Sequence, residues 1–190
     1  MMDAVGADAP FPNLRGGDSV LVIGGTGMLA PAVGDLLAAG LRVVLVSRRA
    51  SGFAAAQHPL LVAVDADWAD PGFAAKAMAA IDPDALRVVI LWVHSAYRDS
   101  VSTALHSALP QNVRFVRLWG SGGGDPHRAA VTAAPLPGRK VGEVFLGSLS
   151  DGCGGNRWLS HREISDGTLA ALRSEASRTV IGNLRAGSGL

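Results

Sequence analysis

The chain has 190 residues, which is enough for one α/β domain with a single buried core. Hydrophobic residues make up 48% and charged residues 17%, with a mean hydropathy of +0.27, so the composition is that of a globular protein and excludes a disordered one. The formal net charge of +1 gives no general attraction to nucleic acid or to an anionic membrane, and the single cysteine, Cys153, excludes an internal disulfide framework and a thiolate-only zinc site.

Residues 1–17 show no hydrophobic periodicity and include Pro10, Pro12, Gly16 and Gly17, so we expect a mobile N-terminal arm followed by one domain over 18–190. The first basic residue is Arg15, which is the wrong charge order for a secretory or transit peptide. No apolar run reaches the roughly 18 residues that a membrane-spanning helix needs. A cytoplasmic protein with no membrane and no nucleic-acid partner is the expectation.

From residue 19 onward, short apolar runs alternate with amphipathic stretches. The apolar runs predict strands at 19–23, 43–46, 60–64, 88–93, 113–118, 141–146 and 179–181. The stretches between them predict helices ending near residue 39, opening at Asp70-Pro71, over 100–109, and from the capping box Ser160-His161-Arg162-Glu163 to about residue 174. This alternation predicts a Rossmann-like, doubly wound parallel sheet of six to seven strands with helices on both faces, and the most apolar run, 88–93, predicts a central strand.

Residues 120–138 are rich in glycine and proline and show no periodicity. Long loops in compact domains are usually functional or mobile. The stretch therefore predicts either a flexible lid that orders over a ligand or a disordered excursion.

A glycine motif joins the first predicted strand to the first predicted helix. Gly24, Gly25, Thr26 and Gly27, followed by Met28 and Leu29, fit the spacing of a dinucleotide-binding turn. Small residues are needed there for a tight turn, for close approach of the backbone to a pyrophosphate and for packing of the helix on the strand. The free N–H groups of the helix N-terminus would then face the phosphates.

The second predicted strand ends in Ser47-Arg48-Arg49, about 20 residues after the glycines. An NAD-binding protein places a carboxylate there, which would repel a 2′-phosphate, whereas guanidinium groups bind one bidentately. We therefore predict NADP(H) as the cofactor, against the alternative of two solvated arginines on a surface turn.

Further motifs stand at the ends of the later strands. Asp65-Ala66-Asp67 follows the third, Trp92-Val93-His94-Ser95 ends the fourth and Gly120-Ser121 follows the fifth, and the segment 157–165 completes the set. Together with the glycine turn these residues resemble the short-chain dehydrogenase/reductase superfamily, and within it the small, atypical NADP-binding members.

The resemblance implies a role for each of these positions. Asp65 and the backbone of Ala66 would border the adenine, and Val93, His94 and Ser95 would lie along the nicotinamide ribose. Ser121 would take the place of the superfamily's catalytic serine. Two alternatives are equally open: Asp65 caps a turn, and Ser121 is a loop residue without a catalytic role. The resemblance also implies a homo-oligomer.

The chain departs from the superfamily in its proton donor. Typical members use a Tyr-x-x-x-Lys pair, in which the lysine lowers the pKa of the tyrosine that protonates the carbonyl. Here the single tyrosine, Tyr97, has no lysine four residues later, and Lys140 is preceded at that spacing by Leu136. The usual proton donor is missing.

His94 and Tyr97 are the predicted replacements. His94 follows the central strand, where ligands bind in open α/β sheets, and an unperturbed imidazole titrates near pH 6.5. Tyr97 follows three residues later and is expected at the same cleft. A structural or cofactor-contacting role for His94 stays open, and Glu143 and His161 are weaker candidates.

Three functions follow from these residues. The first is an NADP(H)-dependent oxidoreductase that reduces a small carbonyl, enone or imine, with Ser121 polarising the acceptor. The second is a non-redox protein that holds NADP(H) as a structural or sensing element. The third uses the pocket for acid–base chemistry such as cyclisation or dehydration, and fold-level analogy cannot choose among them.

Overall fold

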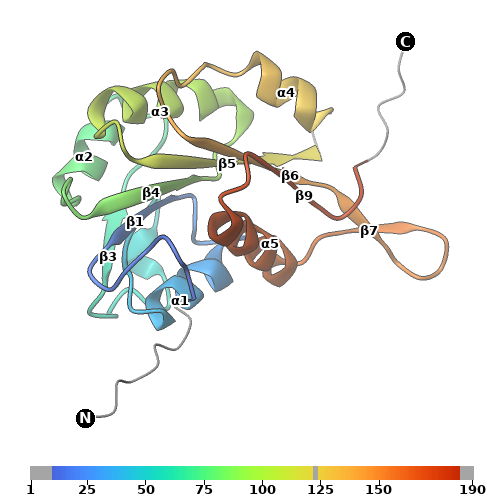
Figure 1. The fold of residues 1–190 in the computed structure, drawn as a ribbon, viewed down its shortest axis with the longest axis horizontal. Coiled ribbons are helices and arrows are strands. Elements are labelled where there is room, and N and C mark those ends of the chain that lie inside the picture. Colours follow the sequence, from blue (N-terminus) through green and yellow to red (C-terminus); the bar gives the residue numbers. More distant parts are fainter. Residues whose placement is uncertain (1–9, 122–123, 185–190) are drawn as a thin grey trace.

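The computed structural model describes residues 10–121 and 124–184, which form a seven-stranded parallel sheet (Figure 1). The strand order is β3-β2-β1-β4-β5-β6-β9, so β4 is central and β9 is an edge, as predicted. The sheet strands are β1 (Ser19–Ile23), β2 (Arg42–Ser47), β3 (Leu61–Asp65), β4 (Leu86–Leu91), β5 (Arg114–Gly120), β6 (Val141–Leu146) and β9 (Arg178–Ile181).

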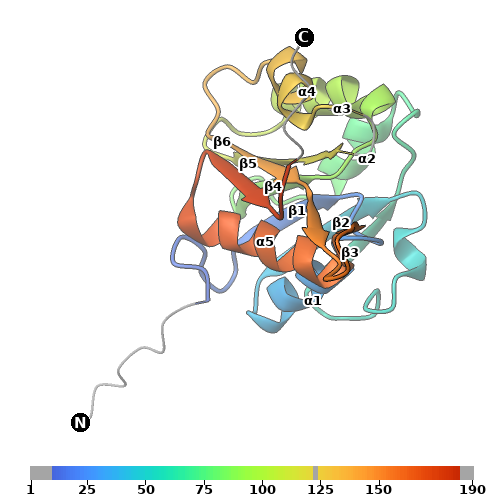
Figure 2. The ribbon, with the colours of Figure 1, turned by 90° about the vertical axis from the view of Figure 1, so that its right-hand side faces the viewer.

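Helices cover both faces of this sheet, which confirms the predicted fold class (Figures 1 and 2). One face carries α1 (Ala30–Ala38) and α5 (His161–Ser174), which pack against each other. The other carries α2 (Phe73–Ala79), α3 (Ser95–Ala108) and α4 (Pro126–Thr132). A 3-10 turn, η1 (Ala50–Gly52), follows β2.

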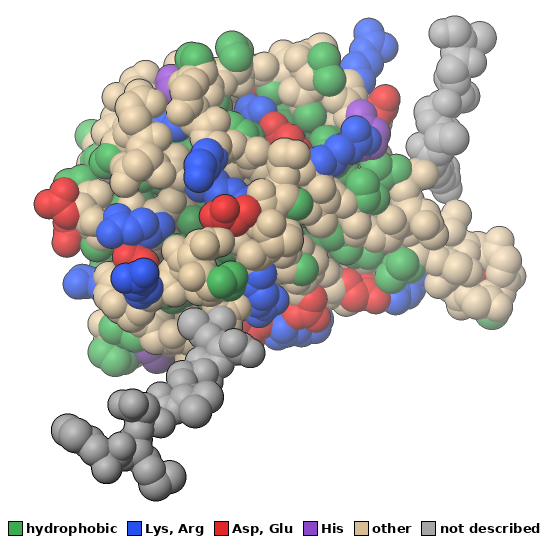
Figure 3. Space-filling view, in the orientation of Figure 1, with side chains coloured by type: hydrophobic (Ala, Val, Ile, Leu, Met, Phe, Trp, Pro, Cys, Tyr) green, Lys and Arg blue, Asp and Glu red, His purple; other side chains and the backbone are tan. Residues whose placement is uncertain are grey.

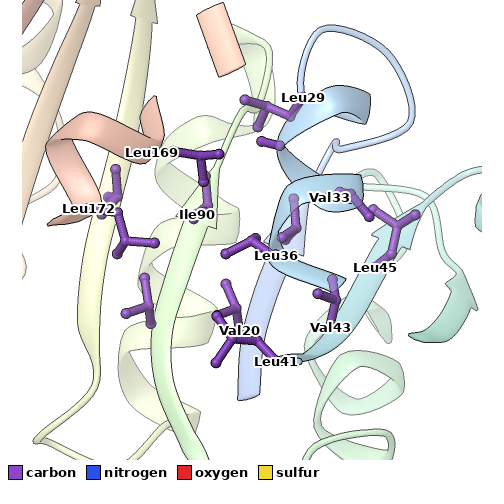
Figure 4. Packing of buried hydrophobic residues seen from close by; sticks show 14 of the residues in the cluster. Val20, Leu29, Val33, Leu36, Leu41, Val43, Leu45, Ile90, Leu169 and Leu172 are labelled. Atoms are coloured by element: carbon purple, nitrogen blue, oxygen red, sulfur yellow. The ribbon is translucent and has the colours of Figure 1, made fainter. Parts of the chain in front are cut away.

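The strands are almost wholly apolar because both of their faces are buried. In β1, Val20 and Val22 belong to the core beneath α1 and α5, whereas Leu21 and Ile23 belong to the core beneath α2 and α3. Figure 4 shows the first of these cores, in which side chains of α1, β1 and β2 meet on one side and those of α5 and β4 on the other.

The N-terminal segment differs from the expectation of a mobile arm in its described part. Phe11 and Leu14 are buried, the Arg173 Nε donates to the Pro10 carbonyl at 2.8 Å, and the Arg173 guanidinium lies over the Phe11 ring. Two apolar side chains in a proline-rich stretch show no periodicity, so the sequence gives no sign of this packing. Residues 1–9 of the expected arm lie outside the described residues.

The stretch 120–138 is not one continuous loop, so this part of the prediction is wrong. It contains α4, which begins where the Asp125 carboxylate accepts the His127 N–H at 2.9 Å and Pro126 occupies the first turn. An Asp-Pro pair is a good helix start, but the seven-residue helix is too short to show a period. Gly122 and Gly123 lie outside the described residues, and the lid stays a prediction.

Two other helix starts differ from the expected ones. Helix α3 begins at Ser95, five residues before the predicted start, which places Tyr97 and Arg98 on the helix. Helix α2 begins at Phe73, after a turn in which Asp70 accepts the Gly72 N–H at 2.7 Å. The polar run after His94 hides its helical character, because few of its side chains are buried.

The last third holds a hairpin and a helix whose start is correctly predicted. Strands β7 (Ser148–Ser150) and β8 (Asn156–Trp158) pair antiparallel and project from the body, and Figure 3 shows this projection as mostly tan because glycine and polar residues dominate it. Helix α5 begins at the capping box of Ser160 and Glu163.

Among the described residues, no helix is long and apolar enough to cross a bilayer, and no group of three or more His, Cys, Asp or Glu side chains is arranged to hold a metal ion.

Candidate functional site

The glycine turn follows β1, and a different physical reason accounts for the glycine at each of its positions. Gly24 has φ +78°, and a Cβ added there would lie 2.2 Å from the Trp92 carbonyl oxygen. A Cβ on Gly25 would lie 2.6 Å and 2.7 Å from the side chains of Val22 and Leu45. A Cβ on Gly27 would meet nothing within 4 Å. The first two glycines are required by the fold, whereas Gly27 borders open space through which a ligand can approach the backbone.

The N-terminus of α1 lies directly behind this open space. No side chain caps it, and Pro31 stands in its first turn, where an N–H group has no helical partner. Thr26 is exposed, Met28 is half-buried and the Leu29 side chain is fully buried in the core. Of the predicted cofactor residues in this turn, Leu29 can therefore contact a ligand only through its backbone.

Arg48 and Arg49 lie at the carboxyl end of β2, and both are exposed. Over residues 10–121 and 124–184, neither guanidinium has a hydrogen bond or an ion pair. Ser47 is buried, and its hydroxyl accepts the Arg49 N–H at 3.4 Å. Two unengaged cations at this strand end are what a 2′-phosphate requires.

Asp65 has a partner of its own at the end of β3. Its carboxylate accepts the Ser51 N–H at 2.8 Å and the Ser51 hydroxyl at 2.6 Å, and these bonds hold the pKa of Asp65 below its usual value. Ala66 is buried, and its N–H donates to the Ser47 carbonyl at 2.9 Å. The structure thus gives both residues a role in joining β3 to the end of β2.

Trp68 is not one of the predicted site residues, but it lies beside them. A Cβ on Gly24 would lie 3.2 Å from its Cζ2, and its ring is 5.3 Å from the His94 ring and 6.4 Å from the Tyr97 ring. Its indole Nε1 is buried without a hydrogen-bond partner among the described residues. Trp68 closes the space between the glycine turn and the end of β4.

A pocket of about 430 Å³ opens at the carboxyl ends of β4 and β5, beside the glycine turn. It brings together four predicted site residues from two parts of the sequence: Met28 after the glycines, and Val93, His94 and Ser95 after β4. The other lining residues are Trp92, Arg98, Gly120, Gly124, Asp125, Ala129 and Trp158. Pockets at this edge of an open α/β sheet are where ligands bind.

His94 and Tyr97 face different pockets, contrary to the expectation of one cleft. His94 is exposed, precedes α3 and lies 6.5 Å from Trp92, ring to ring. Tyr97 lines a second groove of about 270 Å³ between α2 and α3, together with Trp68 and Phe73. His94 is the N-cap residue of α3 and has an extended backbone, whereas Tyr97 lies in the first turn of the helix and faces α2.

Ser121 follows Gly120 directly and is not one of the residues that line the pocket. Of the weaker candidates, Glu143 has its carboxylate engaged by the Arg117 guanidinium and by the Trp119 indole N–H, both at 2.5 Å. His161 is the exposed first residue of α5. Neither side chain lines the pocket, so neither is placed to transfer a proton there.

Two tryptophans, Trp92 and Trp158, line the pocket, whereas Trp119 belongs to the core with 1% of its surface exposed. A Cβ on Gly120 would lie 3.1 Å from the ring of Trp92 and 4.0 Å from that of Trp158. Gly120 therefore leaves space beside two aromatic rings, that of Trp92 directly after β4 and that of Trp158 in the hairpin.

Arg98 is the pocket residue that the sequence does not reveal. It is half-buried, its guanidinium stacks on Trp119 at 4.4 Å, and burial lowers its pKa. In the sequence it stands in a polar stretch that looks like a loop. Only the start of α3 at Ser95 and the position of β5 beneath it turn this side chain into the pocket.

No family model matches the chain, and no curated protein matches it in sequence. Solved structures do match its fold. A short-chain dehydrogenase from Burkholderia cenocepacia in complex with NADP is 18% identical, with a TM-score of 0.66 over 89% of this chain and 90% of that one. A short-chain dehydrogenase/reductase from Veillonella parvula in complex with NADP is 12% identical, with a TM-score of 0.61 over 87% and 94%.

MalC, a reductase/Diels-Alderase from Malbranchea aurantiaca, is 13% identical, with a TM-score of 0.68 over 95% of this chain and 98% of that one. These matches agree with the resemblance carried by the sequence motifs. The chain has the Rossmann fold of the short-chain dehydrogenases/reductases.

Proposed function

We propose that the protein is an NADP(H)-dependent oxidoreductase that reduces a small carbonyl, enone or imine substrate. The observation that carries this proposal is the 430 Å³ pocket, which adjoins the glycine turn at Met28 and contains His94 and Ser95. A substrate in this pocket would lie beside the end of a dinucleotide that starts at the glycine turn. The structural neighbours in complex with NADP support the same reading.

The described residues fit the cofactor. The open space at Gly27 and the uncapped N-terminus of α1 suit the pyrophosphate, and the unengaged guanidinium groups of Arg48 and Arg49 suit the 2′-phosphate. When bound, NADPH supplies a hydride. The chain's own task is to orient the acceptor, exclude water and manage one proton.

His94 is the proposed proton donor. It is the one imidazole among the described residues that line the pocket, and an imidazole is a usable acid near neutral pH. Ser121, which follows the pocket residue Gly120, is proposed to polarise the acceptor oxygen or nitrogen. Tyr97 lines a different groove, so we assign it no part in the reaction.

The test is NADPH oxidation against a panel of small aldehydes, ketones, enones and cyclic imines. His94→Gln is expected to lower kcat by about 10²–10⁴, the usual contribution of a general acid, while the NADPH affinity stays within twofold. Tyr97→Phe is the matched control and is expected to leave kcat unchanged. Unchanged turnover in His94→Gln would remove the assignment of His94.

A second candidate is acid–base chemistry such as cyclisation, with NADP(H) held as a structural element or not used. The missing Tyr-x-x-x-Lys pair favours it, and MalC, whose fold matches over nearly the whole chain, carries a Diels-Alderase activity in its name. Tight NADPH binding with no oxidation across the panel would favour this candidate. Equal affinity for NADPH and NADH would contradict the proposed binding of the 2′-phosphate by Arg48 and Arg49, whichever of the two functions holds.

A further inference from the structure

Arg98 is a cation without an anion in the wall of the pocket. Its Nε is buried and has no hydrogen-bond partner, and no carboxylate of the described residues lies within ion-pair distance of its guanidinium. A buried guanidinium nitrogen without a hydrogen-bond partner is costly, and a bound anion is one way in which such a group is satisfied.

The acidic side chains around Arg98 are held by other groups. The Glu143 carboxylate accepts hydrogen bonds from the Arg117 guanidinium and from the Trp119 indole N–H. Asp99 accepts the Ala134 N–H at 3.1 Å. Asp125 accepts the His127 N–H and caps α4. Burial lowers the pKa of Arg98 and the nearby charges of Asp99 and Glu143 raise it, but among the described residues no carboxylate forms an ion pair with Arg98, so its N–H groups are available to a molecule in the pocket.

Trp119 supports the Arg98 guanidinium from one side, because the guanidinium carbon lies 4.4 Å from the centroid of the Trp119 ring. A guanidinium is planar and carries its N–H groups along its edge. A planar edge of this kind matches a carboxylate, which accepts two parallel N–H bonds. Arg98 is the one arginine or lysine among the described residues that line the pocket, so it can balance the single charge of a carboxylate but not the second charge of a phosphate.

The rest of the pocket suits an apolar body. Trp92 and Trp158 stand on either side of Gly120, and Met28 and Ala129 complete an apolar lining next to the polar groups of His94 and Ser95. An aromatic or branched ring fills such a slot at low cost in hydration.

We propose that Arg98 binds a carboxylate of the substrate, so that the protein acts on small carboxylic acids with an aromatic or apolar body. The assignment of these acids as substrates rests on the proposed function, whereas the binding of a carboxylate at Arg98 does not. Arg98 is then the residue that determines which substrates bind, and it also orients them with respect to His94.

The binding test uses benzoate and benzamide, which have the same ring and differ in charge. Each is titrated by calorimetry into the full-length protein, alone and saturated with NADP⁺. Benzoate is expected to bind at least tenfold more tightly than benzamide. Arg98→Gln is expected to weaken benzoate by about 10- to 100-fold and to leave benzamide unchanged, and Arg98→Lys is expected to restore part of the loss.

Arg128→Gln is the matched control, because it removes one charge from the exposed face of α4 and does not line the pocket. The proposal is overturned if the unsubstituted protein binds benzoate no more tightly than benzamide, or does not bind benzoate at all. This holds even if Arg98→Gln fails to fold. An equal loss in Arg128→Gln overturns it too, since the effect would then be one of net charge.

The two proposals fail in different ways. If NADPH does not bind but benzoate binding depends on Arg98, the proposed oxidoreductase is wrong and the carboxylate site stands. If NADPH is oxidised with neutral ketones and their carboxylate analogues at the same kcat/KM, the oxidoreductase stands and the carboxylate site is wrong.

Discussion

Two neighbouring stretches of the carboxyl edge of the sheet are built in different ways. Over β1 and β2 the candidate cofactor site consists of backbone: a left-handed Gly24, the open approach at Gly27 and the uncapped end of α1. Over β4 and β5 the candidate substrate pocket consists of side chains, which come from β4, α3 and the hairpin. Only exposed arginines add side-chain chemistry to the first stretch.

The difference shows what each part depends on. A backbone site needs the right torsion angles and empty space, so its requirements fall on a few glycines close together in the sequence. A side-chain pocket needs side chains from segments that are far apart, such as Arg98 on Trp119, and the rings of Trp92 and Trp158 that both lie near Gly120. Substitutions in the two stretches should therefore have different consequences.

The sharpest test of the backbone site is Gly24→Ala. A methyl group there would lie 2.2 Å from a backbone oxygen at φ +78°, so strain and overpacking together cost up to about 6 kcal/mol. We expect a large loss in the free energy of unfolding, measured by urea denaturation. Stability within 1 kcal/mol of the unsubstituted protein would show that the turn is not as tight as the structure has it.

Gly27→Ala is its matched control. The added methyl group meets nothing within 4 Å, so stability should change by less than about 1 kcal/mol. NADPH affinity should fall at least tenfold, because the methyl group takes the space of the approaching phosphate. Unchanged NADPH affinity would show that the pyrophosphate does not bind at Gly27.

The side-chain region is tested by Glu143→Ala. Arg117, whose side chain is 8% exposed, would lose its bidentate partner, and Trp119 would lose the acceptor of its indole N–H. Leaving a buried cation unpaired is expected to cost about 3–5 kcal/mol. The double variant Arg117→Leu with Glu143→Leu should recover most of this loss, and failure to recover would show that the pair acts through packing rather than charge.

The next effect concerns cofactor choice. Replacing Arg48 and Arg49 by glutamine is expected to weaken NADPH binding by about 10- to 100-fold, because the 2′-phosphate loses its charged partners. NADH, which lacks that phosphate, should bind as before. The measurement is a fluorescence titration of both cofactors, and equal losses for NADPH and NADH would contradict the assignment.

The backbone-defined stretch was largely predictable from the sequence. The glycine turn, the strands, the central place of β4 and the capping box of α5 all follow from local patterns, because parallel strands buried on both faces leave continuous apolar runs. The side-chain pocket was predictable only in part. Val93, His94 and Ser95 were found because they directly follow a strand.

The residues that the sequence missed share a physical cause. Arg98, Asp125 and Ala129 reach the pocket only because α3 begins early and because α4 forms within an expected loop. A polar helix start and a seven-residue helix leave too few buried positions to show a period. Tyr97 was expected to share a cleft with His94 because the sequence does not show that α3 begins between them, at Ser95.

The smallest expected effect tests how firmly the pocket wall is held by the hairpin. Glu163 binds Arg157 of β8 and the Ser160 N–H, and these contacts lower the pKa of its carboxyl to about 2. Because the folded pKa lies below the usual value of 4.5, the stabilisation is complete above about pH 4.5 and is lost as the pH falls toward 2. Glu163→Gln should therefore lower Tm by about 2–4 °C at pH 7, and the difference should disappear near pH 2.

Arg157→Gln should give the same pH dependence, and the double variant should add nothing further at neutral pH. A Tm difference that persists below pH 2.5 would show that the effect of Glu163→Gln does not come from the ionised carboxylate, and that the hairpin bearing Trp158 is held by contacts other than the ion pair of Glu163 with Arg157.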